Sequence, residues 1–474
     1  MSTKPETPST SILERMFKLR ENNTSIKMEI LGGVTTFITM AYIIFVNPNI
    51  LRAAGMNSGN ALGDAANVYN AFNDPVVGSV MVATCLAAAI GTFIMGFYAN
   101  YPFAQAPGMG LNAFFTYTVV LTYGYTWQQA LTAVFISGII FIIITLTKLR
   151  EAIVDAIPMS IKHATSGGIG LFIALIGFKE AGIIVANPVT MVGFGNLTAP
   201  GTLLALFGLV LTGILMARKV KASMLIGILS TTVVGILTKV VPIPQGFVPF
   251  SAPPSLAPTF LAFDFPGLFK IDAGFLAMIS SVLLVILTFT LVDMFDTIGT
   301  LVGTGNKAGM LDKDGKLPRI NKALMSDAVA TTVGSALGTS TVVTYVESAA
   351  GVLAGGKTGL TSVVVGILFL LALFLAPIAG LVPAFATAPA LIIVGVLMMG
   401  AIKQINFDDF TEAFPAFFTI VMMPFSYSIA NGVAVGLIFY PIVKVATGKA
   451  KEVSPLVYIL AVLFIIRFVL VVGG

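Results

Sequence analysis

The sequence carries very little charge for its length. Of its 474 residues, 10% are Asp, Glu, Lys or Arg, and the mean hydropathy is +0.98. A soluble globular protein carries about 25% charged residues, so the composition excludes a water-soluble fold. The single cysteine, Cys85, and the single histidine, His163, exclude a disulfide scaffold, a thiolate metal cluster and a multi-histidine metal or haem site. We therefore expect no metal and no cofactor.

The charges that are present are clustered, and long apolar tracts separate the clusters. Residues 1–29 hold nine of the 47 charged side chains and residues 303–327 hold eight. The tracts are continuous, whereas a transmembrane β-barrel alternates over segments of about 10 residues. The pattern predicts an all-α polytopic membrane protein. Residues 1–28 lack the apolar core and cleavage site of a signal peptide, which predicts a cytoplasmic tail.

Fourteen tracts are candidate membrane spans, and one further tract follows them. The fourteen lie near 30–50, 77–98, 105–122, 127–147, 164–184, 201–217, 222–241, 277–303, 321–337, 340–353, 360–381, 387–402, 412–429 and 431–446, and the additional one at 454–472. If the N-terminus is inside and the spans alternate, 21 of the 26 Lys and Arg residues lie on the inner side. This bias follows the positive-inside rule, and it explains the net charge of +5 better than nucleic-acid binding does.

The last tract differs from the others because Arg467 interrupts its apolar run. An arginine at the centre of a membrane helix costs about 2.5–3.5 kcal/mol. We therefore favour a helix that lies along the cytoplasmic interface or against the bundle over a fifteenth crossing.

The two halves of the chain resemble each other. Residues 156–179 match 381–403 at an offset of 225, and residues 83–92 match 326–335 in the same order. A unit of seven spans is odd, so its second copy enters the membrane inverted relative to the first. Inverted repeats are typical of secondary transporters, whose substrate site lies near the midplane between the repeats.

The third span of each half is a poor helix. Residues 101–117 contain two prolines and two glycines, and residues 338–352 are rich in Thr, Val and Gly, which breaks a helix or favours extended backbone. Irregular backbone at membrane depth requires satisfaction by protein or a cavity. We expect two half-helices, each preceded by a short strand, that meet near the membrane centre and offer free N–H groups to a polar ligand.

Four carboxylates lie inside apolar tracts, all in the second half: Asp293, Asp296, Asp327 and Glu347. An intramembrane carboxylate indicates a functional site. We favour Asp296 and Glu347 as ligands, although a structural role for Asp296 and a simple capping role for Glu347 remain alternatives. Asp293 shares a helix face with Asp296 but ranks below it, and Asp327 is better explained as a structural hydrogen-bonding residue.

No enzymatic signature is present. The sequence GKTG at 356–359 lacks the spacing of a phosphate-binding loop, and 303–309 follows a helix, unlike a dinucleotide site. We therefore expect a transporter and no catalytic residue. A channel also fits broken helices and buried acids, but an inverted repeat with acids in only one half favours alternating access.

Six motifs in order along the chain are similar to those of the AzgA-like purine permeases, which belong to the nucleobase:cation symporters. The motifs span 32–48, 105–115, 292–303, 338–352, 387–399 and 422–442, and the similarity runs from about 25 to 452. The resemblance implies a 7+7 inverted repeat of 14 spans with a core domain and a gate domain. The implied segments are 1–28 (tail), 29–158 (core, spans 1–4), 159–242 (gate, spans 5–7), 243–275 (extracellular loop), 276–382 (core, spans 8–11), 383–447 (gate, spans 12–14) and 448–474 (C-terminal hydrophobic segment).

The resemblance also implies a site and an activity. It places Asp296 and Glu347 where the family's acidic residues contact the base and exchange a proton. Because the position of a histidine in the uracil and xanthine branch holds Thr300 here, the proton chemistry rests on carboxylates. Import of adenine, guanine or hypoxanthine with a proton across the plasma membrane is the implied function. A pyrimidine base, xanthine or an anion is the alternative cargo, and the purine preferred stays open.

Thr300, which forms one polar patch with Asp296, and the two half-helices supply the remaining candidate ligands. Backbone amides around Gly110–Asn112 and near Val346 would complete the hydrogen bonds to a purine edge, and Phe115 or Tyr345 would stack on its ring. One ionised and one protonated carboxyl group match the base's donors and acceptors. The expected partners are therefore a purine base, a proton and the lipid bilayer, with no nucleic acid; relatives of this fold often dimerise through the gate domain, which makes a homodimer a candidate assembly.

Overall fold

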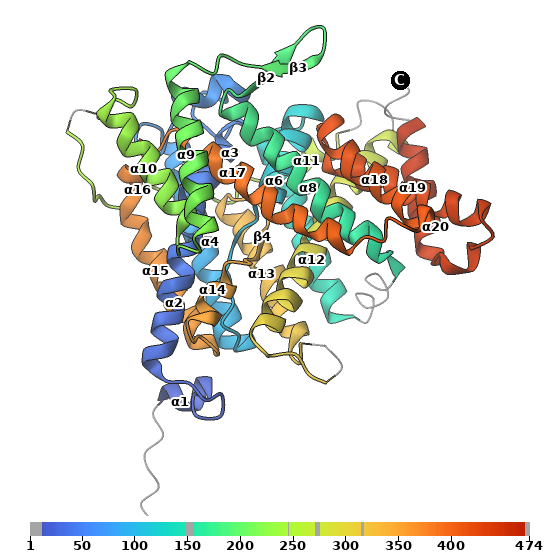
Figure 1. Cartoon of the computed structure of the whole chain (residues 1–474), viewed down its shortest axis with the longest axis horizontal. Coiled ribbons are helices and arrows are strands. Elements are labelled where there is room, and N and C mark those ends of the chain that lie inside the picture. The colour runs from blue at the N-terminus through green and yellow to red at the C-terminus, as the bar shows by residue number, and fades with distance from the viewer. Residues whose placement is uncertain (1–11, 148–155, 245, 271–274, 314–316, 470–474) are drawn as a thin grey trace, which may run out of the picture.

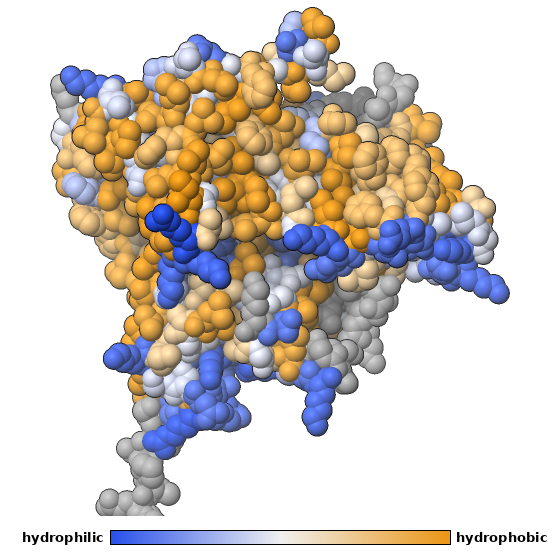
Figure 2. Space-filling model, in the orientation of Figure 1, coloured by the Kyte–Doolittle hydropathy of each residue, from blue (hydrophilic) through white to orange (hydrophobic). Residues whose placement is uncertain are grey.

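The computed structural model describes residues 12–147, 156–244, 246–270, 275–313 and 317–469, and it is almost entirely helical (Figure 1). Within these residues, nine helices are long and apolar enough to cross a membrane, and four shorter apolar helices accompany them. Apolar side chains cover most of the visible outer surface of the helices, and the hydrophilic side chains gather at their ends (Figure 2). The chain is a polytopic helical membrane protein, as predicted; the 14-span inverted repeat stays a prediction.

The helices pack as two groups. The first helix group contains α2 (Ile26–Met40), α3 (Ile43–Arg52), α4 (Pro75–Ile94), η2 (Met95–Ala99), α5 (Met109–Ala113), η3 (Phe114–Thr122), α6 (Trp127–Leu146), α12 (Phe275–Lys307), α13 (Ile320–Leu337), α14 (Ser348–Leu353), α15 (Gly359–Ala372), η4 (Leu373–Leu375) and α16 (Ala376–Leu381). In this group α13 packs on α4 and α6, and α15 packs on α2 and α4.

The second helix group contains α8 (Met159–Glu180), α9 (Pro200–Ala217), α10 (Ser223–Leu237), α17 (Ala384–Met398), η5 (Met399–Gln404), α18 (Phe410–Phe425) and α19 (Ile429–Ala446). Helix α8 packs on α17 and α18, and α17 also packs on α9 and α10. Glycines allow helices α8 and α17 to approach each other closely: a Cβ at Gly170 would lie 2.8 Å from the carbonyl oxygen of Gly395. The two glycines come from α8 and α17, whose sequences are the ones that match at an offset of 225.

Two strands at the start of the broken spans pair with each other. Strand β1 (Gln105–Pro107) is antiparallel to β4 (Val342–Thr344), and Gln105 lies opposite Thr344. The ladder continues at both ends, where the Gly108 amide donates to Thr341 (2.9 Å) and the Tyr345 amide donates to Ala104 (2.9 Å). A short helix follows each strand, α5 and α14 respectively. The predicted strands and half-helices are therefore present, and all residues of both strands are buried.

Smaller elements lie outside the two groups. They are α1 (Ile12–Phe17), η1 (Gly63–Val68), β2 (Ile184–Asn187), β3 (Met191–Phe194), α11 (Phe265–Leu268), η6 (Ala450–Glu452) and α20 (Pro455–Arg467). The antiparallel hairpin β2–β3 projects from the end of the molecule opposite α1 (Figure 1), and the apolar pattern did not predict it. The expectation of an all-α chain missed this hairpin, because each of its strands has only four residues, IVAN and MVGF, which is too short to show a clear alternation.

Both ends of the chain contain a helix in their described part. Helix α1 lies in the predicted tail, of which residues 1–11 lie outside the described part. Helix α20 packs on α19 and α12, with Val457, Leu460 and Phe464 buried and its other face exposed, so it lies against the bundle. The end of the predicted tract, 470–472, and the basic residues Lys148 and Arg150 also lie outside the described residues.

Glu29 joins the start of α2 to the start of α15. Its side chain is fully buried and accepts hydrogen bonds from the backbone amides of Lys357 (2.9 Å), Thr358 (3.2 Å) and Thr361 (3.2 Å), and from the Thr361 hydroxyl (2.7 Å). The first amides of a helix lack partners within it, so the carboxylate satisfies them and complements the helix dipole. The sequence did not reveal this role, because Glu29 resembles one more charge of the polar tail.

We expect Glu29→Ala to destabilise the folded protein by about 1–3 kcal/mol, because it leaves buried amides without an acceptor. Thermal unfolding of the purified protein in detergent measures the effect. Glu21→Ala is the control, since Glu21 forms only an exposed ion pair with Lys18, and such pairs contribute about 0–1 kcal/mol. Equal melting temperatures for the two variants would contradict this role.

Candidate functional site

Glu347 lies at the start of α14, directly after the paired strands. Its side chain makes no capping hydrogen bond to the helix, which argues against the simple capping role. The Tyr42 hydroxyl donates to Glu347 Oε1 at 2.6 Å instead. Tyr42 lies at the interruption between α2 and α3, where the chain makes a turn at residues 41–42. The turn between α2 and α3 therefore fixes the orientation of the carboxyl group at the start of α14.

Asp296 and Tyr345 lie near Glu347. Asp296 comes from α12, which packs against both β4 and α14. Tyr345 directly follows β4, and its hydroxyl donates to the Pro107 carbonyl at 2.5 Å. The structure thus gathers Asp296, Tyr345, Glu347 and Tyr42 at one place between α12 and the strand pair.

A pocket of about 410 Å³ includes Glu347 in its lining. This volume lies within the range of about 300–1,000 Å³ that is usual for small-molecule sites. Its lining comes from α14 and the preceding turn, from α2, from the loop between α9 and α10, and from α17; it includes Thr39, Val346, Glu347, Lys219 and Leu397. The pocket therefore lies between the two helix groups, with Glu347 from the first and the lysine loop from the second.

The other predicted site residues lie elsewhere. Asn112 is fully buried, accepts a hydrogen bond from the Ser340 hydroxyl, and has no described partner for its Nδ2. Phe115 is also fully buried and does not line the pocket. A Cβ at Gly110 would lie 2.8 Å from Ile169 Cγ2, so this glycine allows α5 to approach α8. Thr300 is partly buried, and its carbonyl accepts from the Thr304 hydroxyl.

The sequence interpretation missed Tyr42 and Glu180. Tyr42 lies in the run TMAYII, where a lone tyrosine looks like an ordinary apolar residue; the signal is the turn that follows Met40. Glu180 ends α8, and its Oε1 accepts from the Tyr117 hydroxyl at 2.5 Å. The expectation that acids inside apolar tracts occur only in the second half is therefore wrong, because Glu180 lies in the tract 164–184 and ends α8.

The contact between Tyr117 and Glu180 is part of a polar seam between the two helix groups. In this seam the Thr118 hydroxyl donates to the Tyr427 carbonyl (3.2 Å), and the Tyr123 and Ser428 hydroxyls lie 2.9 Å apart. Tyr117, Thr118 and Tyr123 lie in or next to η3 of the first group, and their partners belong to the second group. The seam lies near the β2–β3 hairpin that follows α8, at the end opposite the tail helix α1.

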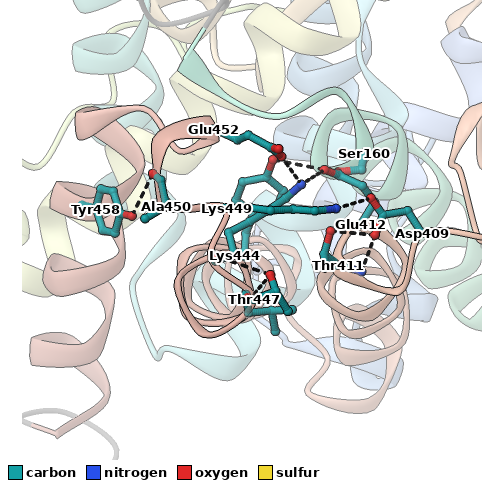
Figure 3. A network of polar contacts seen from close by, with 12 residues as sticks. Ser160, Asp409, Thr411, Glu412, Lys444, Thr447, Lys449, Ala450, Glu452 and Tyr458 are labelled. Atoms are coloured by element: carbon teal, nitrogen blue, oxygen red, sulfur yellow. Dashed lines mark hydrogen bonds and ion pairs between the residues drawn. The ribbon is translucent and has the colours of Figure 1, made fainter.

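A second polar network lies within the second group, away from the pocket (Figure 3). Lys444, 2% exposed, contacts Glu412 and Glu452 at 2.7 Å each, and Lys449 contacts Asp409 at 3.1 Å. Hydrogen bonds from Thr411, followed by one from Lys449, lower the pKa of Asp409 to about 2. The network ties α18 to α19 and to η6, and it has no direct contact with Glu347.

Residues 27–435 match the family model Xan_ur_permease, described as Permease family. The chain belongs to this family. The expected resemblance to nucleobase permeases is confirmed, and the permease is not an enzyme.

Three relatives match the permease along nearly its whole length. "Putative permease MJ0326" of Methanocaldococcus jannaschii is 54% identical and covers 97% of this chain and 99% of its own. The guanine/hypoxanthine permease PbuG of Bacillus subtilis is 46% identical (96% and 99%). The adenine permease AdeP of Escherichia coli is 44% identical (98% and 98%).

Solved structures share the fold at low identity. The transmembrane domain of the cyanobacterial bicarbonate transporter BicA aligns with a TM-score of 0.59 at 17% identity, over 85% of this chain and 97% of that one. SLC26A9 aligns with a TM-score of 0.56 at 14% identity, over 92% and 69%. These similarities show the fold of the permease but do not identify its substrate.

Cysteine labelling can test whether the pocket is accessible to small molecules. The only native cysteine, Cys85, is buried, so the wild type provides the background. Val346 is 50% exposed and lines the pocket, whereas Phe115 is 0% exposed. Because thiol reactions require access, Val346→Cys should react with a small maleimide in the purified permease and Phe115→Cys should not. Equal labelling, measured by mass spectrometry, would contradict the pocket.

Proposed function

We propose that the permease imports purine bases into the cell across the plasma membrane by proton symport. The observation that carries this proposal is the carboxyl pair of Asp296 and Glu347, with Glu347 at the end of a pocket of about 410 Å³. Relatives that carry the names adenine permease and guanine/hypoxanthine permease, at 44% and 46% identity, support the choice of cargo. The N-terminus then lies in the cytoplasm, as the distribution of basic residues predicts.

The site chemistry suits the edge of a purine. The base offers ring N–H donors and nitrogen or oxygen acceptors, which one ionised and one protonated carboxyl group can match. Tyr42 holds Glu347 through a 2.6 Å hydrogen bond, so this carboxyl group already has one donor and keeps its other oxygen for the base. Proximity of the two acids favours a proton on one of them when the site is empty.

An anion is a poorer cargo for this site. Two carboxyl groups repel an anion, and the nearest lysines, Lys219 and Lys221, are exposed at the pocket mouth. The bicarbonate transporter and SLC26A9 share the fold alone, at 17% and 14% identity. One fold can host different functions through different sites. We therefore base the choice of cargo on the two acids and not on the shared fold.

The two helix groups support alternating access. We propose that the first group is the core domain and the second the gate domain, with the substrate site between them. The pocket is open beside the lysine loop of α9 and α10, which the positive-inside rule places in the cytoplasm. The polar seam from Tyr117 to Ser428 closes the opposite end. The arrangement is therefore an inward-open state, and breaking the seam is required for the outward-open one.

Uptake into proteoliposomes tests the proposal. Accumulation of labelled adenine or hypoxanthine should rise as the external pH falls and collapse with a protonophore, because each base enters with a proton. A one-unit pH difference supports up to about tenfold accumulation for one proton per base. Unlabelled purine bases should compete, and sulfate and nucleosides should not. Uptake that follows a sodium gradient and ignores the protonophore would refute proton symport.

Variants of the two acids test the site. Asp296→Asn and Glu347→Gln keep size and polarity but remove the charge, so each should abolish accumulation. Loss of a charged hydrogen-bond partner in a buried site costs about 1.5–3 kcal/mol, or roughly 10- to 150-fold in affinity. His163→Ala, near the start of α8, is the control and should transport normally once equal expression is shown. Normal accumulation by Asp296→Asn would remove this residue from the site.

A further inference from the structure

Two more acids meet behind the candidate site. Asp293 lies on α12 and Asp327 on α13, and both side chains are fully buried. The contacts between the two helices are crossed and bring the acids to the same level: Thr297 of α12 donates to Asp327, and the Thr331 hydroxyl of α13 lies 3.1 Å from Asp293. Neither residue lines the pocket at Glu347, and their side chains contact Gln105, Thr297 and Thr331 inside the first helix group.

Three of the four carboxyl oxygens have donors. Gln105 Nε2 donates to Asp327 Oδ1 at 3.1 Å, and the Thr297 hydroxyl donates to Asp327 Oδ2 at 2.8 Å. The Thr331 hydroxyl lies 3.1 Å from Asp293 Oδ2. Asp293 Oδ1 has no N–H or O–H donor among the described residues. A buried acceptor left without a donor is unfavourable, and more so when it is charged.

Among the described residues, no hydrogen bond or ion pair joins either acid to a cation. Helices α4 and α6 and strands β1 and β4 carry no charged side chain, and the one thiol among them is Cys85 of α4. The basic residue on α13, Lys322, lies over the Tyr98 ring at 5.2 Å. The charged group that interacts with both members of the pair is another acid, Asp296. Two ionised carboxylates in such a place repel each other in a medium of low dielectric constant.

A single proton resolves both problems. Placed on Asp293 Oδ1 and directed at Asp327, it removes one of two negative charges and turns the oxygen without a donor into a donor. Asp327 then keeps its two donors, Gln105 and Thr297, and accepts the new hydrogen bond as well. We propose that Asp293 and Asp327 form a proton-binding site that shares one proton and exchanges it during the transport cycle.

Thr331 connects this acid pair to the substrate site. Its hydroxyl carries one hydrogen but lies within reach of two acceptors, Asp293 Oδ2 at 3.1 Å and the Val342 carbonyl at 2.9 Å. Loss of the shared proton draws the hydroxyl hydrogen toward Asp293 and away from β4. Strand β4 leads directly to Tyr345 and Glu347. The presence or absence of the proton on the acid pair thus acts on the position of α14, which begins directly after Glu347.

The decisive variant is Asp293→Asn in proteoliposomes. Its amide can donate to Asp327 and so imitates the protonated pair, but it cannot release a proton. Exchange of labelled base for unlabelled base across the membrane should persist, whereas accumulation driven by a one-unit pH gradient, up to about tenfold in the wild type, should be lost. Asp327→Asn should behave in the same way. Asp408→Asn, in an exposed loop, is the matched control.

An infrared measurement reads the proton directly. The spectrum of the purified wild type should contain a carbonyl stretching band of a protonated carboxyl group that shifts in heavy water, and Asp293→Asn should lack that band. This readout is independent of transport. The role of the pair in the transport cycle rests on the proposed proton symport. A wild type that transports no purine base would contradict the proposed function, and the infrared spectrum would then still test whether the acid pair holds a proton.

Several outcomes would overturn the proton site. Normal accumulation by Asp293→Asn would remove the pair from coupling, and loss of base binding by a monodisperse Asp293→Asn would assign it to substrate binding instead. A band that disappears on addition of sodium, together with sodium-driven uptake, would make it a cation site. If neither variant folds, a wild-type spectrum without any protonated-carboxyl band overturns the proposal.

Discussion

The pairing of β1 with β4 is the contact on which the centre of this protein depends. Backbone at membrane depth that is not helical needs hydrogen-bond partners within the protein. Each broken span supplies them to the other, through three paired positions and the flanking bonds at Gly108 and Tyr345. The two halves of the chain, more than 200 residues apart in sequence, are therefore held together where their half-helices begin, and the acid at the start of α14 occupies a fixed place.

Polar groups cluster around this strand pair because the strands leave side chains on both sides. On one side Glu347 accepts from Tyr42 and meets the pocket. On the other, Gln105 of β1 contacts Asp327, and Val342 of β4 contacts Thr331. Burying so many polar side chains is costly unless each is paired. In the proposed proton site, loss of one proton changes the hydrogen bond between Thr331 and Val342, and this change acts on β4.

The fold of this protein does not by itself decide which molecule it transports. The bicarbonate transporter and SLC26A9 share the architecture at identities of 17% and 14%, which is compatible with several kinds of cargo. In this chain the pocket lies between the two helix groups, and the contact between Tyr117 and Glu180 joins the groups elsewhere. We propose Asp296 and Glu347 as the site, and two carboxyl groups favour a neutral base with donors and acceptors on its edge.

The sequence by itself determined the membrane character, the helical class, the family and the two broken spans, because hydropathy and the Pro, Gly and Thr content act locally along the chain. It also singled out Asp296 and Glu347, since a carboxylate within an apolar tract stands out. It did not reveal Tyr42, the role of Glu29, the position of Glu180 or the partnership of Asp293 with Asp327. Those depend on contacts between segments far apart in sequence, and only the packing of α12, α13 and the strand pair decided which polar groups meet and which oxygen lacks a donor.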